Sequence, residues 1–130
     1  MIEAYNTTSA AVTAGAQAPL SASDTYCDKD NLTLSGNTIT VNEPGTYLIS
    51  ADFVFTPTDT SAAVQMLVNG AVVPQTLRQV TATADAVTAL HTQHVINVPC
   101  VCRISGVTIA FVYPNAGTQS VANVIVQRVR

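Results

Sequence analysis

We predict an all-β fold for this chain, a sandwich of about eight to ten antiparallel strands in one domain over residues 1–130. Apolar and polar side chains alternate with a period of two along most of the sequence, as they do in half-buried strands. Turn signals separate these stretches at short, regular intervals. Thr, Val and Ala each occur 18 times, whereas the chain has one Lys and two Glu, a composition that does not favour a helical protein.

The stretch from Gly45 to Phe55 is the clearest predicted strand. Its alternate apolar side chains would share one face and enter the core: Tyr47, Ile49, Ala51, Phe53 and Phe55. Leu48 and Val54 lie on the other face, so we expect that face to be partly buried too. Pro44 and Gly45 take the second and third positions of the preceding turn, which suits a type II turn.

A hairpin is predicted around Asn69 and Gly70, which follow the apolar run 63–68. Both residues accept a positive φ, so an Asn-Gly pair between two apolar runs is a strong hairpin signal. The return strand is predicted at 71–73, before Pro74. Residues 75–86 are polar and rich in Ala and Thr, which indicates a long loop or a weak edge strand.

Further strands are predicted at 38–41, 87–98, 103–113 and 120–129. Within 103–113 one face carries four apolar side chains: Val107, Ile109, Phe111 and Tyr113. We assign Ile109 and Phe111 to the core. The Ala-rich segment 10–19 is predicted to be strand, loop and strand, because Thr13, Gly15 and Pro19 interrupt any helix.

Composition also excludes several classes of function. Five cations in a chain of net charge −3 do not supply the basic footprint of a nucleic-acid-binding protein. No run of about 18 apolar residues predicts a membrane span. The first residues lack the basic and apolar regions of a signal peptide, so we expect the protein to act where it is made, or to leave by lysis or within a larger particle.

The cysteines and histidines do not predict a metal centre. Cys27, Cys100 and Cys102 are odd in number, and we expect them to be buried free thiols rather than a disulfide framework. His91 and His94 are three positions apart on a predicted strand, so they would point to opposite faces and not converge on zinc.

Asp28 and Asp30 are the candidates for a calcium site. With Asp24 and Asn31 they form an oxygen-rich segment, and calcium binds six to eight oxygens. The spacing is not that of an EF-hand, and Lys29 dilutes the negative charge, so a solvated turn is the preferred interpretation. We therefore expect no cofactor. The motifs of the common hydrolases, phosphate-binding loops and metalloproteases are missing, and we expect no catalytic residues and no enzyme activity.

Four stretches together resemble a known family and span nearly the whole chain. They are Ile39–Val41 leading through Pro44-Gly45 into Tyr47–Ser50, Val64–Val68 ending in Asn69-Gly70, the opening Ala4–Asn6 with Val12 and Gly15, and the closing Val124–Val129. These stretches are similar to those of the tumour-necrosis-factor-like jelly roll, the fold of the globular head of the first complement component. Bacterial and phage members of this family cap surface fibres or decorate virions.

The resemblance implies a compact homotrimer whose inner sheets pack around a threefold axis. Composition independently favours association, because with 10% charged residues the chain has little polar surface to cover a monomer. Tyr5 and Tyr113 are the candidates for the trimer seam.

Two functions follow as hypotheses. The first is a structural trimer on a virion surface, a phage or prophage protein of the capsid-decoration or head-fibre type, with a capsid or other virion protein as its partner. The alternative is an adhesin-like module on a bacterial cell or spore surface, which would recognise a receptor or glycan through the apical loops 75–86 and 28–30. Fold alone does not decide between them.

Overall fold

The computed structural model describes residues 1–26, 31–99 and 106–130, and within them it confirms the predicted all-β sandwich. These residues form eleven strands, one more than the upper limit predicted. The strands are β1 (Ile2–Asn6), β2 (Ala10–Val12), β3 (Ala22–Thr25), β4 (Leu32–Ser35), β5 (Thr38–Val41), β6 (Gly45–Pro57), β7 (Ser61–Val68), β8 (Ala71–Thr81), β9 (Thr88–Val98), β10 (Val107–Val112) and β11 (Gly117–Arg128). No helix long and apolar enough to cross a membrane occurs in this described part.

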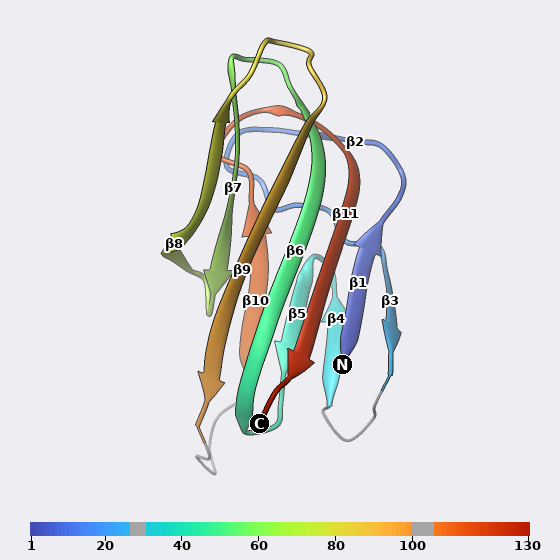
Figure 1. The fold of residues 1–130 in the computed structure, drawn as a ribbon. Helices are drawn as coiled ribbons and strands as arrows, with labels where there is room; N and C mark the ends of the chain where they lie inside the picture. The colour runs from blue at the N-terminus through green and yellow to red at the C-terminus, as the bar shows by residue number, and fades with distance from the viewer. Residues whose placement is uncertain (27–30, 100–105) are drawn as a thin grey trace.

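Two antiparallel sheets form the sandwich. The six-stranded sheet has the order β3-β1-β11-β6-β9, with β2 paired to β11, and the five-stranded sheet has the order β4-β5-β10-β7-β8. Figure 1 looks onto the six-stranded sheet, with the five-stranded sheet behind it. The long strand β6 lies between β11 and β9 and pairs with both along most of its length. The chain therefore pairs strands far apart in sequence.

The core lies between the two sheets and is built on the inward face of β6. Tyr47, Ile49, Phe53 and Phe55 are all buried there, and Ile109 and Phe111 of β10 are buried opposite them. Phe53 packs at the centre of an aromatic cluster, with ring centroids 5.2 Å from Phe111 and 5.7 Å from Tyr113. Phe55 stacks on Tyr113 at 4.4 Å. Burial of this apolar surface is the main favourable contribution to folding.

Tyr113 is fully buried in this core, so the prediction that it lies at a trimer seam is wrong. It continues the inward face that Ile109 and Phe111 begin, and its ring fills the space beside Phe55. The hydroxyl group donates to Oε1 of the buried Gln119 at 2.6 Å, and Nε2 of Gln119 donates to the carbonyl oxygen of Pro19 at 3.0 Å. Burial raises the pKa of the Tyr113 hydroxyl.

We expect Tyr113→Phe to lower the free energy of unfolding by about 1–3 kcal/mol, because it leaves Oε1 of Gln119 buried without its donor. Tyr5→Phe is the matched control. It removes a hydroxyl from a side chain that is only half-buried, and we expect a change of at most about 0.5 kcal/mol. Urea unfolding at one protein concentration measures both. Equal midpoints for the two variants would contradict the buried hydrogen bond.

The hairpin of β7 and β8 turns at Asn69 and Gly70. Their φ angles are 53° and 79°, and Val68 pairs with Ala71, so these residues form a two-residue loop with positive φ at both positions. Pro74 does not end the return strand. Strand β8 continues to Thr81 as the edge of its sheet, so residues 75–81 form the edge strand that was one of the two predicted alternatives.

A bulge in β8 accommodates Pro74. Val73 pairs with Met66 and Arg78 pairs with Val64, so residues 74–77 lie opposite Gln65 alone. The buried Thr76 holds this bulge, because its Oγ1 accepts a hydrogen bond from the Met66 amide at 2.9 Å and donates to the Val73 carbonyl at 2.6 Å. Proline is tolerated in a sheet at such bulges and edges.

The predicted type II turn at Pro44 and Gly45 is also wrong. Gly45 has a φ of 150° and is already the first residue of β6, paired with Val98, whereas the third position of a type II turn has φ near +80°. The physical reason is that β5 and β6 belong to different sheets, so the chain crosses the sandwich here rather than reversing. Glycine is still required, because a Cβ would lie 2.7 Å from the Arg130 carbonyl oxygen.

Candidate interaction face

The outward side of the six-stranded sheet is the surface with the features of an interface, and we name it the outer face. Cross-strand pairing sets its rows, because residues opposite one another in adjacent strands point to the same side of a sheet. The rows are Gln127, Leu48 and Val95; Glu3, Ile125, Ser50 and Gln93; Tyr5, Asn123, Asp52 and His91; and Val121, Val54 and Ala89.

Apolar side chains are distributed across this outer face. Leu48, Val54 and Ile125 are half-buried, while Val95 and Val121 are 54% and 39% exposed. The outward side of the five-stranded sheet carries recurring threonines, Thr33, Thr38, Thr40 and Thr108, beside an apolar group of Leu67, Val72, Ala110 and Val112. Exposed apolar surface is a usual mark of an interaction site.

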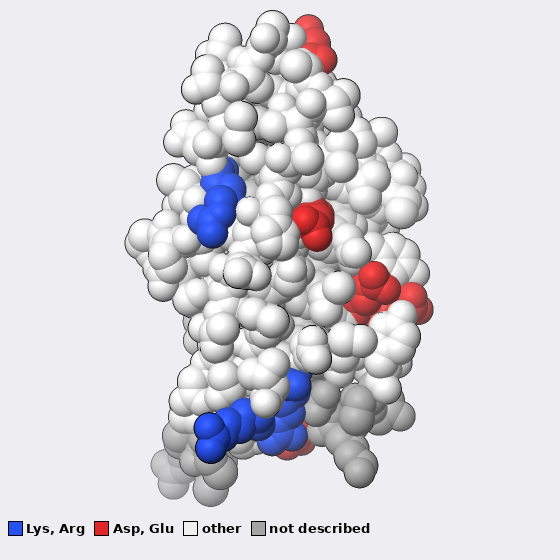
Figure 2. Space-filling model, in the orientation of Figure 1, with Lys and Arg blue, Asp and Glu red and all other residues white. Residues whose placement is uncertain are grey.

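Charged groups are few on the outer face, and they are separated. Figure 2 shows this side as largely uncharged, with acidic groups near its middle, at one edge and at the upper end, and basic groups at the opposite edge and the lower end. Asp52 of β6 is the central acid. Its Oδ1 lies 2.7 Å from Nδ1 of His91 on the adjacent strand, and both side chains are more than half exposed. An exposed pair of this kind contributes at most about 1 kcal/mol to stability.

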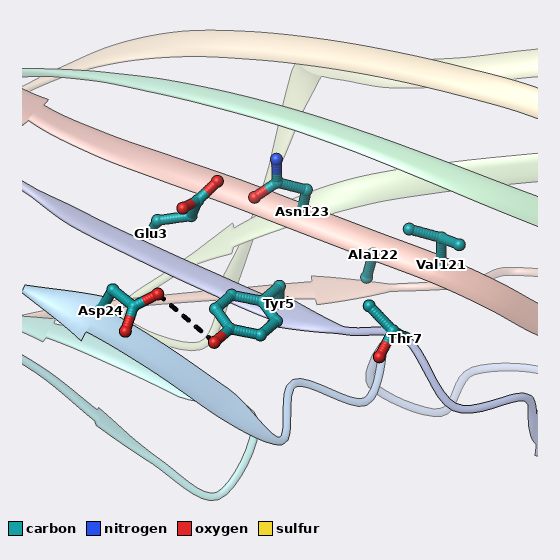
Figure 3. Close-up of a pocket in the computed structure, with 7 residues that line it drawn as sticks. All are labelled: Glu3, Tyr5, Thr7, Asp24, Val121, Ala122 and Asn123. Atoms are coloured by element: carbon teal, nitrogen blue, oxygen red, sulfur yellow. Dashed lines mark hydrogen bonds between the residues drawn. The ribbon is translucent and has the colours of Figure 1, made fainter.

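A pocket of about 310 Å³ lies at the β1 and β3 edge of the outer face (Figure 3). The residues that line it are Glu3, Tyr5, Thr7, Asp24, Val121, Ala122 and Asn123. The Tyr5 hydroxyl donates to Oδ2 of Asp24 at 3.3 Å, and the Tyr26 hydroxyl donates to Oε1 of Glu3 at 3.4 Å. The negative charge of Asp24 raises the pKa of Tyr5, and that of Glu3 raises the pKa of Tyr26.

Asn123 carries a buried polar atom at the wall of this pocket. Its Oδ1 accepts no hydrogen bond from any described residue. Figure 3 shows this oxygen on the side that faces Glu3. A buried acceptor without a donor is unusual in a folded protein, so this position is suited to a donor from outside the chain.

The metal-binding candidates do not converge in the structure. His91 points outward and His94 lies half-buried on the other side of β9. Over residues 1–26, 31–99 and 106–130, no group of three His, Cys, Asp or Glu side chains could hold a metal ion. Asp28 and Asp30, and all three cysteines, Cys27, Cys100 and Cys102, lie outside the described residues.

Comparisons with known proteins agree on the architecture. No protein-family profile and no curated protein sequence matches the chain. Among solved structures, the globular domain of zebrafish complement 1qA matches with a TM-score of 0.69 at 7% identity, over 95% of this chain and 94% of that one. The Eiger TNF of S. frugiperda matches with a TM-score of 0.72 at 10% identity, over 98% and 92%. The vertex protein of phage PRD1 matches with a TM-score of 0.59 at 15% identity, over 99% and 96%.

The fold is the tumour-necrosis-factor-like jelly roll. The predicted resemblance is therefore confirmed as a likeness of fold. In this jelly roll, Tyr5 lines the pocket on the outer face together with Glu3 and Asp24, whereas Tyr113 lies in the core. Sequence reasoning missed Glu3 and the Asp52–His91 pair, because no local motif marks residues that only strand pairing brings together.

Of the two loops in the binding-module hypothesis, the structure describes only 75–86. Most of 75–86 belongs to β8, which leaves a loop at residues 82–87 at the upper end in Figure 1. Residues 28–30 are outside the described part, and the flanking ends of β3 and β4 lie at the lower end.

Proposed function

We propose that the protein is a non-enzymatic structural homotrimer on a particle surface, a phage or prophage virion component of the capsid-decoration or head-fibre type. The observation that carries the proposal is the outer face. Its apolar side chains form two groups, Leu48 and Ile125 with Val95, and Val54 with Val121, and the polar row that contains Asp52 lies between them. A closed symmetric assembly would remove these apolar groups from water.

The particle-surface role is supported by the comparison with the vertex protein of phage PRD1, whose fold covers nearly the whole of this chain. Complement and TNF domains have the same fold, so the fold alone does not assign the location. We propose the virion surface as the location and a capsid protein as the partner.

We expect Val54→Asp to abolish self-association, because it replaces an apolar side chain of the outer face with a second charge next to Asp52. Sedimentation equilibrium at micromolar concentration would give the wild type three times the mass of the 13.6 kDa chain, and the variant the mass of one chain. Leu67→Asp, on the outward side of the five-stranded sheet, is the matched control and should remain trimeric. A wild type that is monomeric under these conditions would refute the trimer.

The location is tested on particles from the source organism. Phage particles are induced, banded in a density gradient and analysed by mass spectrometry in parallel with washed cell envelopes. We expect peptides of this chain in the particle band at a stoichiometry similar to that of other structural proteins. Their presence only in the envelope or spore-coat fraction would instead support the adhesin-like alternative.

A further inference from the structure

The pocket at the β1 and β3 edge is acidic. None of the described residues that line it is Lys or Arg, and Glu3 and Asp24 contribute two carboxylates. Each carboxylate accepts a long hydrogen bond from a tyrosine hydroxyl, at 3.4 and 3.3 Å. The unpaired Oδ1 of Asn123 adds a third acceptor at the same wall. These three acceptors match the chemistry of a guanidinium group, which is planar and carries five N–H donors.

Arg78 is an exposed cation that the fold holds in place. It is the first residue after the bulge of β8, and its Nη1 donates to the carbonyl oxygens of Gln75 at 3.1 Å and Leu77 at 2.9 Å. Both bonds use one nitrogen, which leaves Nε and Nη2 to bind a carboxylate. Leu77 and Val80 beside it are also exposed, at 37% and 43%. This edge of the molecule therefore presents a positioned cation among apolar side chains.

The bulge is tied to the six-stranded sheet. The Thr92 hydroxyl of β9 donates to the carbonyl oxygen of Thr76 at 2.7 Å, within the buried part of the bulge. Arg78 therefore lies next to the β9 edge of the outer face, whereas Glu3 and Asp24 lie at its β1 and β3 edge. Figures 1 and 2 show these two edges on opposite sides of the molecule.

Opposite edges of one subunit are the surfaces that meet in a ring. A rotational assembly of identical subunits uses a heterologous contact, in which one edge of each copy packs against the other edge of the next. Such a contact is favoured when the two edges complement each other in charge. The edge with the acidic pocket and the edge that carries Arg78 have opposite charge.

We propose that Arg78 of one copy binds in the pocket formed by Glu3, Asp24 and Asn123 of the next copy. The inference rests on the proposed self-association and adds to it the residue pair that sets the orientation of neighbouring subunits. Leu77, next to Arg78, would pack against the outer face of the neighbouring copy, near Val121. Each ring would contain this contact once at every interface.

The test is a charge exchange across the interface. We expect Arg78→Glu to raise the concentration needed for half-assembly at least about tenfold, and the paired change Glu3→Lys with Asp24→Lys to do the same. Combining all three changes in one chain should restore assembly to within about threefold of the wild type. Arg130→Glu, which makes the same change of net charge at the C-terminus, is the control and should assemble normally.

Sedimentation equilibrium of all four variants provides the measurement, with circular dichroism to confirm that each is folded. Arg78→Glu could also weaken assembly by loosening the bulge. The changes Glu3→Lys and Asp24→Lys would not repair a loosened bulge, so restored assembly of the triple variant would indicate a direct contact between copies. If the wild type assembles and Arg78→Glu assembles equally well, or if the triple variant stays dissociated, this contact is refuted while self-association stands. A monomeric wild type would refute the proposed function itself.

Discussion

Replacing Phe53 with alanine is expected to lower the free energy of unfolding by about 3–5 kcal/mol. The side chain is 1% exposed and contacts both Phe111 and Tyr113 from the centre of the aromatic cluster. Alanine would leave a cavity between the two sheets. Strand pairing within each sheet limits the movement of the backbone, so the neighbouring side chains could close the cavity only in part. Domains of this size are stable by about 5–15 kcal/mol, and the loss would be a large fraction of the total.

Urea unfolding, followed by circular dichroism at one fixed protein concentration, provides the measurement, because self-association shifts apparent stability. Phe53→Leu is the matched control. It keeps most of the volume and should cost about 1–1.5 kcal/mol. A Phe53→Ala variant with a wild-type midpoint would show that the inward face of β6 is assigned wrongly, and Tyr47→Ala, buried on the same face, would repeat the test independently.

Replacing Gly117 with alanine is expected to lower the free energy of unfolding by about 3 kcal/mol, at the upper end of the range for overpacked cores. A Cβ at this position would collide with the carbonyl oxygen of Thr56 and with the ring of Phe55. Gly117 pairs with Pro57 at the start of β11, so the backbone itself blocks relief of the clash. The methyl group would have to push β11 away from β6, the two strands on which the outer face is built.

Thr118→Ala tests the same strand without the clash, because Thr118 is half-buried and removal of its side chain creates no overlap. We expect it to change the free energy of unfolding by no more than about 0.5 kcal/mol. Thermal and urea unfolding of the two variants provide the comparison. A Gly117→Ala variant as stable as Thr118→Ala would mean that β11 and β6 approach each other less closely than described here.

Local pattern was sufficient for some elements and misleading for others. The alternation through Tyr47 and Phe55 identified β6 and its inward face, because that pattern depends on residues within one strand. The same alternation placed Tyr113 on one face with Phe111, yet Tyr113 was also a candidate for the trimer seam. Its partner, Gln119, comes from the next strand, and only the packed core shows that a buried acceptor is available.

The edge strand β8 shows a different limit. Pro74 indicated the end of a strand, and the Ala and Thr residues after it favoured a loop or a weak edge strand equally. The strand continues because the bulge removes the need for a Pro74 amide, and because Thr76 replaces the missing pairing with its own hydroxyl. No sequence signal within 71–81 shows that Thr92 also anchors this bulge from another strand.

By itself, the amino-acid sequence determined the all-β class, the strand β6 and the hairpin at Asn69, because these depend on side-chain alternation and turn chemistry among near neighbours. Only the tertiary structure decided that Glu3 and Asp24 share a pocket with Asn123, and that Arg78 lies at the opposite edge of the outer face. The physical reason is that strand order and register join segments about a hundred residues apart, and no local preference encodes which strands will become neighbours.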